Sequence, residues 1–207
     1  TKLVEVSQFK FVDLSSLATI GPVWDNIMFG DYRYFPVNQC GWSIVANNFC
    51  PVEKFPTDPL CYGDVYFKLI DPAQNGGKSI LFGPSTYNIK LDKPTKIRRI
   101  HFLGWSKWKE NPAVLTFGEQ NQGVEMRPNI HYGGSCNSGA VKAGQLVYCA
   151  DWDAVPADRT KAKNYAGKTK MCIYKWTIEN PDPRSPIESL KITGANGLAI
   201  HALTIER

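Results

Sequence analysis

The sequence lacks any apolar run long enough to cross a membrane and has only a small excess of one charge. A membrane-spanning helix needs about 20 apolar residues in a row, and no segment of the 207 residues approaches that length. The 24 Lys and Arg residues nearly balance the 19 Asp and Glu residues, which leaves a net charge of +5. Nucleic-acid-binding proteins usually carry a basic stripe or patch. We therefore expect neither a membrane span nor a nucleic-acid partner.

Familiar catalytic patterns are also missing. The chain has no Ser-His-Asp arrangement, no glycine-rich phosphate loop and no His-rich metal motif. Two of its three histidines, His101 and His201, fall inside predicted strands, where a structural role is more common than a catalytic one. Asp151 and Asp153 are two positions apart, which is a poor way to place two carboxylates across a glycosidic bond. We predict a protein that is not an enzyme and needs no cofactor.

Cysteine, by contrast, is well represented. An even number of cysteines with no Cys-x-x-Cys pair favours three disulfides and an oxidising compartment, with fifteen pairings left open. The chain begins at Thr1 with a charged, alternating segment that is not a signal peptide, which suits either a mature product or an excised domain. The cysteines favour the first, so we expect a mature, secreted, extracellular protein. The predicted disulfide cysteines are Cys40, Cys50, Cys61, Cys136, Cys149 and Cys172.

Short apolar or alternating runs follow one another along the chain, separated by Gly and Pro. The 17 Gly, 14 Pro and 12% aromatic residues suit many short strands and turns better than long helices. Only Leu14–Ala18 and Ala157–Tyr165 could hold a helical turn, and Asn26–Cys61 reads as a long irregular loop. We predict an all-β fold, a single antiparallel β-sandwich domain over residues 1–207, stapled by disulfides. The strand candidates are Val4–Val12, Val65–Ile70, Ser79–Phe82, Thr86–Leu91, Lys96–Leu103, Ala113–Phe117, Gly144–Cys149, Thr169–Thr177, Leu190–Thr193 and, with uninterrupted alternation, Leu198–Ile205.

Several segments occur in an order that resembles a known family. The most specific is Gly63–Ser79, which contains Ile-Asp-Pro-Ala-Gln-Asn-Gly-Gly-Lys-Ser. Together the segments resemble the galactose-binding-like jelly-roll modules found beside glycoside hydrolases in secreted bacterial polysaccharide-degrading proteins. The resemblance spans nearly the whole chain and implies a carbohydrate-binding jelly roll. The other segments are Phe11–Ser15, Gly41–Ser43, Ile100–Leu103, Lys175–Pro181, Ile187–Leu190 and Ile200–Glu206.

The chain departs from that family at two places. Those modules usually carry an acidic, glycine-rich stretch before the Gly-Trp pair, where this chain has Phe35–Cys40. The family's Phe-Leu-His is Phe102-Leu103-Gly104 here. The cysteines are not part of the family pattern either, which suggests a specialised, stabilised variant. Ligand and metal contacts of the family are therefore not carried over from these two positions.

Trp105 and Trp108 form the first candidate carbohydrate-binding site. They follow a predicted strand in a turn, and loops at the end of a sandwich often carry function. A Trp ring can stack on the C–H face of a sugar, while neighbouring Lys and Asn side chains contact its hydroxyls. The alternative is that one or both rings cover the core.

The second candidate is Asp151-Trp152-Asp153, in a region where the resembled modules carry an Asp-Trp pair in a loop. The Trp ring could stack on a sugar, while the two carboxylates accept hydrogen bonds from its hydroxyls. Arg127 could support the same site. The alternatives are a packed Trp between two solvated acids, and a surface Arg.

A structural Ca²⁺ ion is a further possibility, because jelly-roll binding modules of this class often hold one. Calcium requires several oxygen ligands. Asp13, Asp25, Asp31 and Glu206 are available, but no spacing pattern selects among them. The metal-binding residues are therefore left open.

Taken together, the sequence predicts non-catalytic extracellular carbohydrate binding, with a polysaccharide or other glycan as the partner. The site would use aromatic and polar residues in loops at one end of the sandwich. The alternative is a self-assembling subunit of an extracellular filament or coat. In that homo-oligomer, residues 1–12 would lie along the sheet edge of a neighbouring copy.

Overall fold

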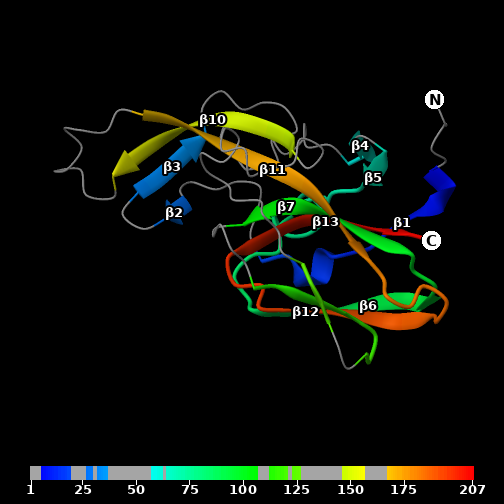
Figure 1. Cartoon of the computed structure of the whole chain (residues 1–207). Helices are drawn as coiled ribbons and strands as arrows, with labels where there is room; N and C mark the ends of the chain where they lie inside the picture. Colours follow the sequence, from blue (N-terminus) through cyan, green and yellow to red (C-terminus); the bar gives the residue numbers. More distant parts are fainter. Residues whose placement is uncertain are drawn as a thin grey trace.

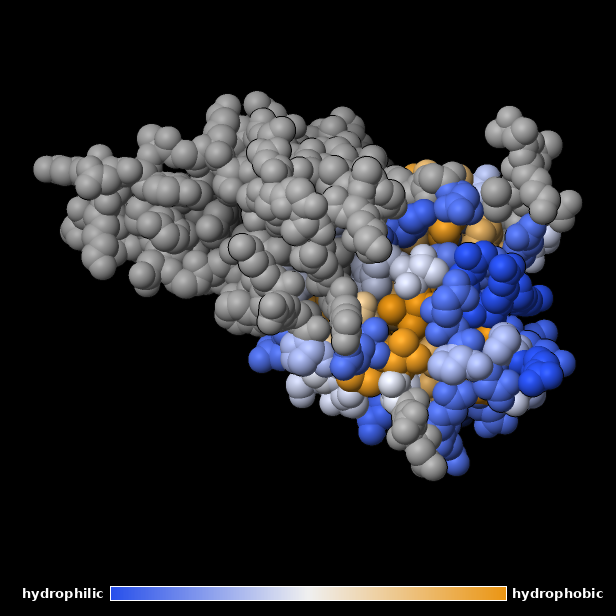
Figure 2. Space-filling view, in the orientation of Figure 1, coloured by the Kyte–Doolittle hydropathy of each residue, from blue (hydrophilic) through white to orange (hydrophobic). Residues whose placement is uncertain are grey.

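Figure 1 shows the computed structural model of the chain, which is all-β apart from two short 3₁₀ turns in the described ranges. Residues 6–19, 27–29, 32–36, 57–62, 64–106, 112–120, 123–126, 146–156 and 167–207 are described, with backbone alone at 6, 27–29, 32–36, 62, 146–156 and 167–173. Within these ranges, no helix has the length and apolar character of a membrane span. Figure 2 shows hydrophilic residues over most of the described surface in this view, with a smaller apolar area at its centre.

The larger of the two main sheets is antiparallel throughout. In spatial order it contains β1 (Phe9–Phe11), β13 (Leu198–Glu206), β7 (Arg99–Ser106), β11 (Gly167–Glu179), β10 (Leu146–Pro156), β3 (Tyr32–Pro36) and β2 (Ile27–Phe29). Strand β11 pairs with β7 through its second half and mainly with β10 through its first half. It therefore connects the β1-β13-β7 part of the sheet to the β10-β3-β2 part.

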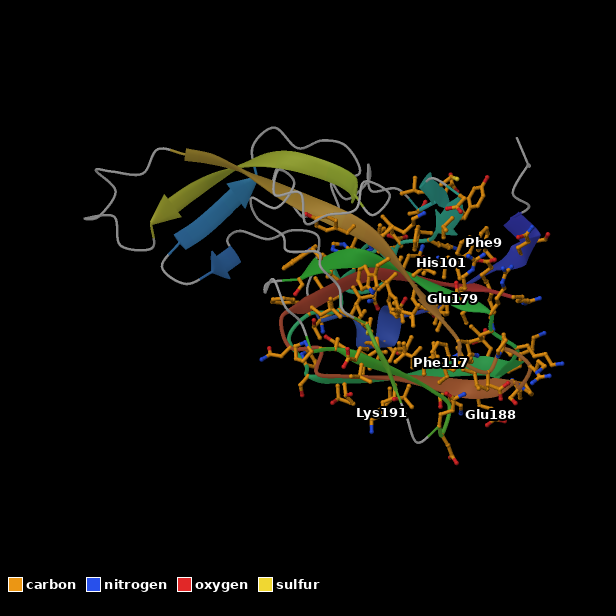
Figure 3. All side chains as sticks on the ribbon, viewed as in Figure 1. Phe9, His101, Phe117, Glu179, Glu188 and Lys191 are labelled. Carbon is orange, nitrogen blue, oxygen red and sulfur yellow. The ribbon has the colours of Figure 1, made fainter. Side chains whose placement is uncertain are left out.

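A smaller antiparallel sheet forms the second layer. It contains β6 (Thr86–Thr95), β12 (Ile187–Thr193), β8 (Val114–Phe117) and β9 (Val124–Glu125). Figure 3 shows Phe117 between the layers, while the exposed Glu188 and Lys191 project from the other face of this sheet. Alternation along each strand explains this division, because successive residues point to opposite faces.

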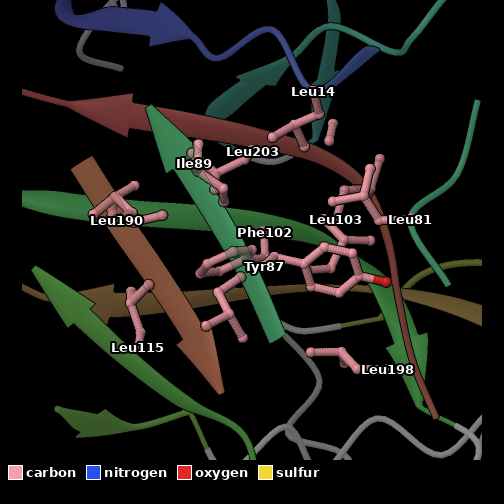
Figure 4. Packing of buried hydrophobic residues seen from close by; sticks show 14 of the residues in the cluster. Leu14, Leu81, Tyr87, Ile89, Phe102, Leu103, Leu115, Leu190, Leu198 and Leu203 are labelled. Atoms are coloured by element: carbon pink, nitrogen blue, oxygen red, sulfur yellow. The ribbon is translucent and has the colours of Figure 1, made fainter. Parts of the chain in front are cut away.

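One hydrophobic cluster joins the two layers. Phe102 and Leu203 come from the larger sheet, and Tyr87, Leu115 and Leu190 come from the smaller one (Figure 4). The Phe102 and Trp176 rings stack within this cluster with centroids 5.1 Å apart. Two antiparallel sheets that enclose a shared core make a β-sandwich, so this part of the predicted fold is confirmed.

A small hairpin covers part of the outer face of the larger sheet. Strands β4 (Leu60–Tyr62) and β5 (Val65–Phe67) pair with each other, and Thr204 in β13 donates a 2.7 Å hydrogen bond to the Tyr66 carbonyl. The ring of Phe9 lies 6.1 Å from that of Tyr66. Because β13 lies between β1 and β7 and is also covered by this hairpin, all 9 of its residues are buried.

Strand β13 contains an irregularity at His201. The register with β7 passes from Ile200 to Ala202 and leaves His201 as an extra residue. Such an insertion reverses the alternation of faces along a strand. Leu198 and Leu203 therefore lie on the same, core-facing side, although an unbroken strand would put them on opposite sides. The uninterrupted alternation predicted for this segment is wrong.

Other boundaries differ from the predicted ones. The stretch predicted as an irregular loop over 26–61 contains β2, β3 and the start of β4. The opening strand is short, because the 3₁₀ turn η1 (Val6–Gln8) precedes β1. The expected helical turn near Leu14 is present as η2 (Ser15–Leu17), while residues 157–165 lie outside the described ranges.

Strand β1 forms an edge of the larger sheet. Phe9–Phe11 pairs with β13 of the same chain, and the Val12 amide donates to the Leu203 carbonyl at 3.1 Å. One edge of β1 is therefore already paired within the molecule. A contact with a neighbouring copy would have to use its other edge, and residues 1–5 lie outside the described ranges.

Candidate functional site

Trp105 is a core residue and not a binding platform. It lies in β7, is 1% exposed, and its ring centroid is 5.3 Å from that of Phe82. A ring buried this completely cannot stack on a sugar, so the prediction of Trp105 as a carbohydrate-binding residue is wrong. The predicted turn is absent here because β7 continues through Ser106. Trp108 and Arg127 lie outside the described residues.

The Asp151-Trp152-Asp153 segment lies in a strand, and the loop expected there is wrong. It belongs to β10, which pairs with β11 on one side and β3 on the other. Successive residues of a strand lie on opposite faces. Trp152 is therefore on one face of the sheet, and the two aspartates are on the other. The predicted arrangement, with one ring between two carboxylates in a single site, is corrected.

The face that carries Trp152 is rich in aromatic residues. The register pairs Trp152 with Pro36 on β3 and with Thr169 on β11. It also places Tyr34 and Tyr32 on the same face, opposite Ala154 and Pro156 of β10. Strand β2 continues this face through two further apolar residues. We call this set the aromatic face; it consists of Trp152, Tyr34, Tyr32, Pro36, Ile27 and Phe29.

The opposite face of the same strands is charged. Asp151 is paired with Lys170, and Asp153 with Lys168, across β10 and β11. Directly opposed residues of opposite charge stabilise an antiparallel pair by about 0.2–1 kcal/mol. Arg33 lies on this face as well, opposite Val155. The register therefore places each aspartate directly opposite a lysine.

These two faces belong to the part of the larger sheet that extends past the smaller one. Figure 1 shows β2, β3 and β10 at the left, beyond the layer formed by β6 and β12. A face of a sheet is either covered by another layer or open to solvent and ligands. The strand register thus places aromatic residues on one face of this part of the sheet and charged residues on the other.

A buried polar network lies on the outer face of the larger sheet, where β7, β11 and β13 meet. Nε2 of His101 is 2.9 Å from Oε2 of Glu206, and its Nδ1 is 2.8 Å from the Thr177 hydroxyl. The Arg99 guanidinium donates to Oε1 of Glu206 at 2.7 Å. The ring of Phe9 packs edge-on against the imidazole at a centroid distance of 6.0 Å. Figure 3 shows Phe9 and His101 on the same side of the sheet.

Burial and hydrogen bonding together determine the protonation state of each member of this network. Burial alone would raise the pKa of Glu206, but hydrogen bonds from Arg99 and His101 outweigh it and hold this pKa below its ordinary value. Burial lowers the pKa of His101, against the opposing influence of the carboxylate. An ionised carboxylate can only accept hydrogen bonds. Neutral His101 therefore donates from Nε2 and accepts the Thr177 hydroxyl proton at Nδ1.

The order of hydroxyl, imidazole and carboxylate also occurs in hydrolase triads. Here the carboxylate is shared with Arg99, and Thr177 lies within β11 between Lys175 and Glu179. The Lys175 ammonium is in turn 2.9 Å from Asp64, and this hydrogen bond holds the pKa of that carboxyl below its ordinary value. We interpret the network as a structural link that joins three strands and the hairpin.

A groove of about 780 Å³ opens near the end of β1 and the turn that follows β5. Its lining includes Asp13, Asp58, Lys68 and Asp71. Hydrogen bonds from Ser15 lower the pKa of Asp13, and the backbone amide of Ser15 lies 2.9 Å from its Oδ1. Asp71 accepts the Ala73 amide in the same way at 2.9 Å. Two of these carboxylates therefore already stabilise local turns.

The Ile-Asp-Pro-Ala-Gln-Asn-Gly-Gly-Lys-Ser block forms the turn beside this groove. The side-chain amide of Asn75 donates to the carbonyls of Ser15 and Lys78, at 2.9 and 3.0 Å. Gly76 and Gly77 have φ values of 60° and 82°, in the region that favours glycine. The residues that carry most of the family resemblance thus hold this turn against η2, which explains them without a ligand.

In the described part of the chain, no three His, Cys, Asp or Glu side chains are grouped so that they could hold a metal ion. Of the four residues considered for calcium, Asp13 is bound to Ser15, and Glu206 is bound to Arg99 and His101. Asp25 and Asp31 lie outside the described ranges. A structural Ca²⁺ ion therefore stays a prediction.

Comparison with known proteins adds no relative to this picture. No family model matches the chain, and no curated protein matches it. The resemblance to galactose-binding-like modules therefore remains a prediction from the sequence motifs.

Proposed function

We propose that this protein is a non-catalytic carbohydrate-binding module that holds a glycan on its aromatic face. One observation carries the proposal: the strand register puts Trp152, Tyr34 and Tyr32 on the same face of β10 and β3. Aromatic rings offer flat apolar surfaces, and Tyr and Trp add a polar group at the ring edge. A glycan presents C–H faces and hydroxyl groups side by side, so it complements both parts of these side chains.

The spacing of these residues suits a ligand longer than one sugar. Tyr34 and Tyr32 are two positions apart on β3, which separates their Cα atoms by about 7 Å. Trp152 is diagonal to Tyr34 across the β10–β3 pair, a separation of about 7–8 Å that large side chains can bridge. A glycan in contact with all three would lie across two strands. Affinity per site would be modest, so repeated sites on the ligand would strengthen binding.

Hydroxyl contacts in this proposal come from the aromatic face itself. Asp151 and Asp153 are on the opposite face, so we no longer assign them to the same site as Trp152. Thr169 is directly opposite Trp152 on β11 and shares its face. Thr169, Tyr34 and Tyr32 are therefore the hydroxyl-bearing residues that we assign to this face.

The fold family and location form part of the same proposal. The ordered motifs support a galactose-binding-like jelly roll, and the six cysteines support a secreted, disulfide-stapled protein. A glycan outside the cell is the partner that agrees with both. The filament alternative receives no specific support, because one edge of β1 is already paired with β13.

The test is a glycan array followed by affinity measurements on matched variants. Trp152→Ala and Tyr34→Ala should each weaken binding about tenfold, because each removes one stacking contact. Lys168→Ala changes the opposite face of the same strands and should leave the dissociation constant unchanged within about twofold. Circular dichroism of each variant checks that the sheet is intact.

Two results would overturn the proposal. The first is a blank array with protein that is folded and monodisperse. The second is glycan binding that survives both aromatic substitutions but is lost in Lys168→Ala, which would move the site to the charged face. Release of reducing sugar from a bound polysaccharide would instead identify an enzyme.

A further inference from the structure

Cys149 and Cys172 occupy directly opposed positions in the larger sheet. The antiparallel register of β10 and β11 pairs these two residues with each other, and Ala150 with Met171 next to them. Cys61, the other cysteine in a described strand, lies opposite Tyr66 in the β4–β5 hairpin. Within the described strands, β10 and β11 are thus the pair in which two cysteines lie directly opposite each other.

The positions satisfy the backbone requirement for a disulfide. Bridged cysteines have Cα atoms about 4.4–6.8 Å apart. Opposed residues in an antiparallel pair have Cα atoms about 4.5 or 5.5 Å apart, depending on the hydrogen-bond pattern, and both values fall in that range. Diagonal neighbours, at about 7–8 Å, do not. We infer that Cys149 and Cys172 form a disulfide that staples β10 to β11.

The chemistry is an ordinary thiol–disulfide exchange. One thiolate attacks a disulfide oxidant of the glutathione type, and a mixed disulfide forms as one thiol of the oxidant leaves. The second thiolate attacks the protein sulfur of that mixed disulfide and expels the second thiol. The two cysteines lose two electrons and two protons, and the oxidant gains them as its own S–S bond is reduced.

The bond has two consequences. It leaves Cys40, Cys50, Cys61 and Cys136, which reduces the fifteen possible frameworks to three. It also prevents β10 and β11 from slipping, and a slip of one residue would move every side chain of a strand to the other face. Cys149 is three positions from Trp152. If the aromatic face is the glycan site, as proposed above, this bond holds the register of that site.

Tryptic peptide mapping tests the pairing directly. Cleavage after Lys and Arg places Cys149 in peptide 143–159 and Cys172 in peptide 171–175. The other cysteines fall in peptides 34–54, 55–68 and 110–142, so each alternative partner gives a different mass. Thiols are blocked before digestion at mildly acidic pH, where exchange is slow.

The expected result is a linked 143–159 and 171–175 pair that separates on reduction. The inference is overturned if either peptide is linked to one of the other three, or if both carry the blocking group. This readout does not depend on glycan binding. A linked pair with a blank glycan array would support the staple and overturn the proposed function alone.

A variant pair measures what the bond does. Cys149→Ser with Cys172→Ser removes both thiols and leaves the other four cysteines intact. Amide hydrogen exchange in peptide 143–159 should become about tenfold faster than in the wild type, because the strand pair opens more readily. Cys149→Ala with Cys172→Ala should behave the same way. Unchanged exchange in both double variants would show that no bond constrains these strands.

Discussion

Nε2 of His101 donates a 2.9 Å hydrogen bond to Oε2 of Glu206 and so joins β7 to the end of β13 on the outer face of the larger sheet. Arg99 holds the other oxygen of the same carboxylate at 2.7 Å. A buried charge is tolerated only when it is paired and hydrogen-bonded, and Glu206 meets both conditions. The last strand of the chain is therefore held in place by polar contacts as well as by the core.

Glu206→Gln should lower the free energy of unfolding by about 2–4 kcal/mol, because it removes the buried negative charge that the Arg99 guanidinium contacts most closely and that accepts from His101. Urea unfolding monitored by tryptophan fluorescence measures the change. Glu179→Gln is the matched control, since that carboxylate is 71% exposed and lies 3.8 Å from the same guanidinium. The control should change stability by less than about 0.5 kcal/mol. Equal losses in the two variants would show that the buried carboxylate of Glu206 stabilises the fold no more than the exposed carboxylate of Glu179 does.

His201 should make the protein sensitive to acid. Its ring is wholly buried, neither nitrogen has a hydrogen-bond partner in the described part of the chain, and burial lowers its pKa to about 3. An unfolded histidine has a pKa of about 6.5, so below that pH the unfolded state binds a proton that the folded state does not. Above pH 6.5 the titration of this histidine does not reduce the free energy of unfolding. Below that pH, it lowers the free energy of unfolding by up to about 1.4 kcal/mol per pH unit, down to about pH 3.

His201→Leu should remove this slope, because leucine cannot titrate in the unfolded state. Denaturant unfolding at about pH 7 and about pH 4.5 gives the slope for each protein. The variant should lose less stability between these two values than the wild type does, by up to about 2.7 kcal/mol if the full slope applies. His101 remains in both proteins and contributes equally to each. Parallel slopes would mean that His201 does not control acid unfolding.

The β-sandwich was predictable because local sequence patterns carry it. Residues 86–91 alternate between exposed and buried along β6, as the sequence of this segment suggests. The arrangement of β3 beside β10 has no such local signal, because it brings Tyr34 opposite Ala154 across more than 100 positions of the chain. Long-range register decides that Trp152 and Asp153 face opposite ways. The residue types of the candidate site could therefore be chosen from the sequence, but their division between two faces of the sheet could not.

The failed prediction at Trp105 has a specific physical cause. A glycine followed by Trp, Ser and Lys is typical of a turn. Gly104 instead lies inside β7, where a Cβ atom would collide with the carbonyl oxygen of Ala199 on β13. Glycine is there because two backbones approach closely, and the strand continues past it. Only the partner strand distinguishes these two uses of glycine.

Trp105→Ala should act on stability rather than on glycan binding. Removing a fully buried Trp leaves a cavity and should cost about 3–5 kcal/mol. Thermal unfolding followed by circular dichroism measures this loss. At a temperature where the variant is folded, its dissociation constant for any array-identified glycan should match that of the wild type. A stable Trp105→Ala protein that has lost binding would restore Trp105 as a contact residue.

Gly104→Ala should be among the most damaging small substitutions in the molecule. The new methyl group would meet the Ala199 carbonyl, and backbone atoms in the middle of a sheet cannot move aside without breaking the β7–β13 pairing. A loss of about 3 kcal/mol in the free energy of unfolding is expected, at the upper end for overpacking. Gly77→Ala is the control, because its φ is 82° but nothing lies within 4 Å of the new atom. It should cost about 1 kcal/mol, from backbone strain alone. If urea unfolding ranks Gly77→Ala as the more costly change, the close approach of β7 and β13 at this point is not present in solution.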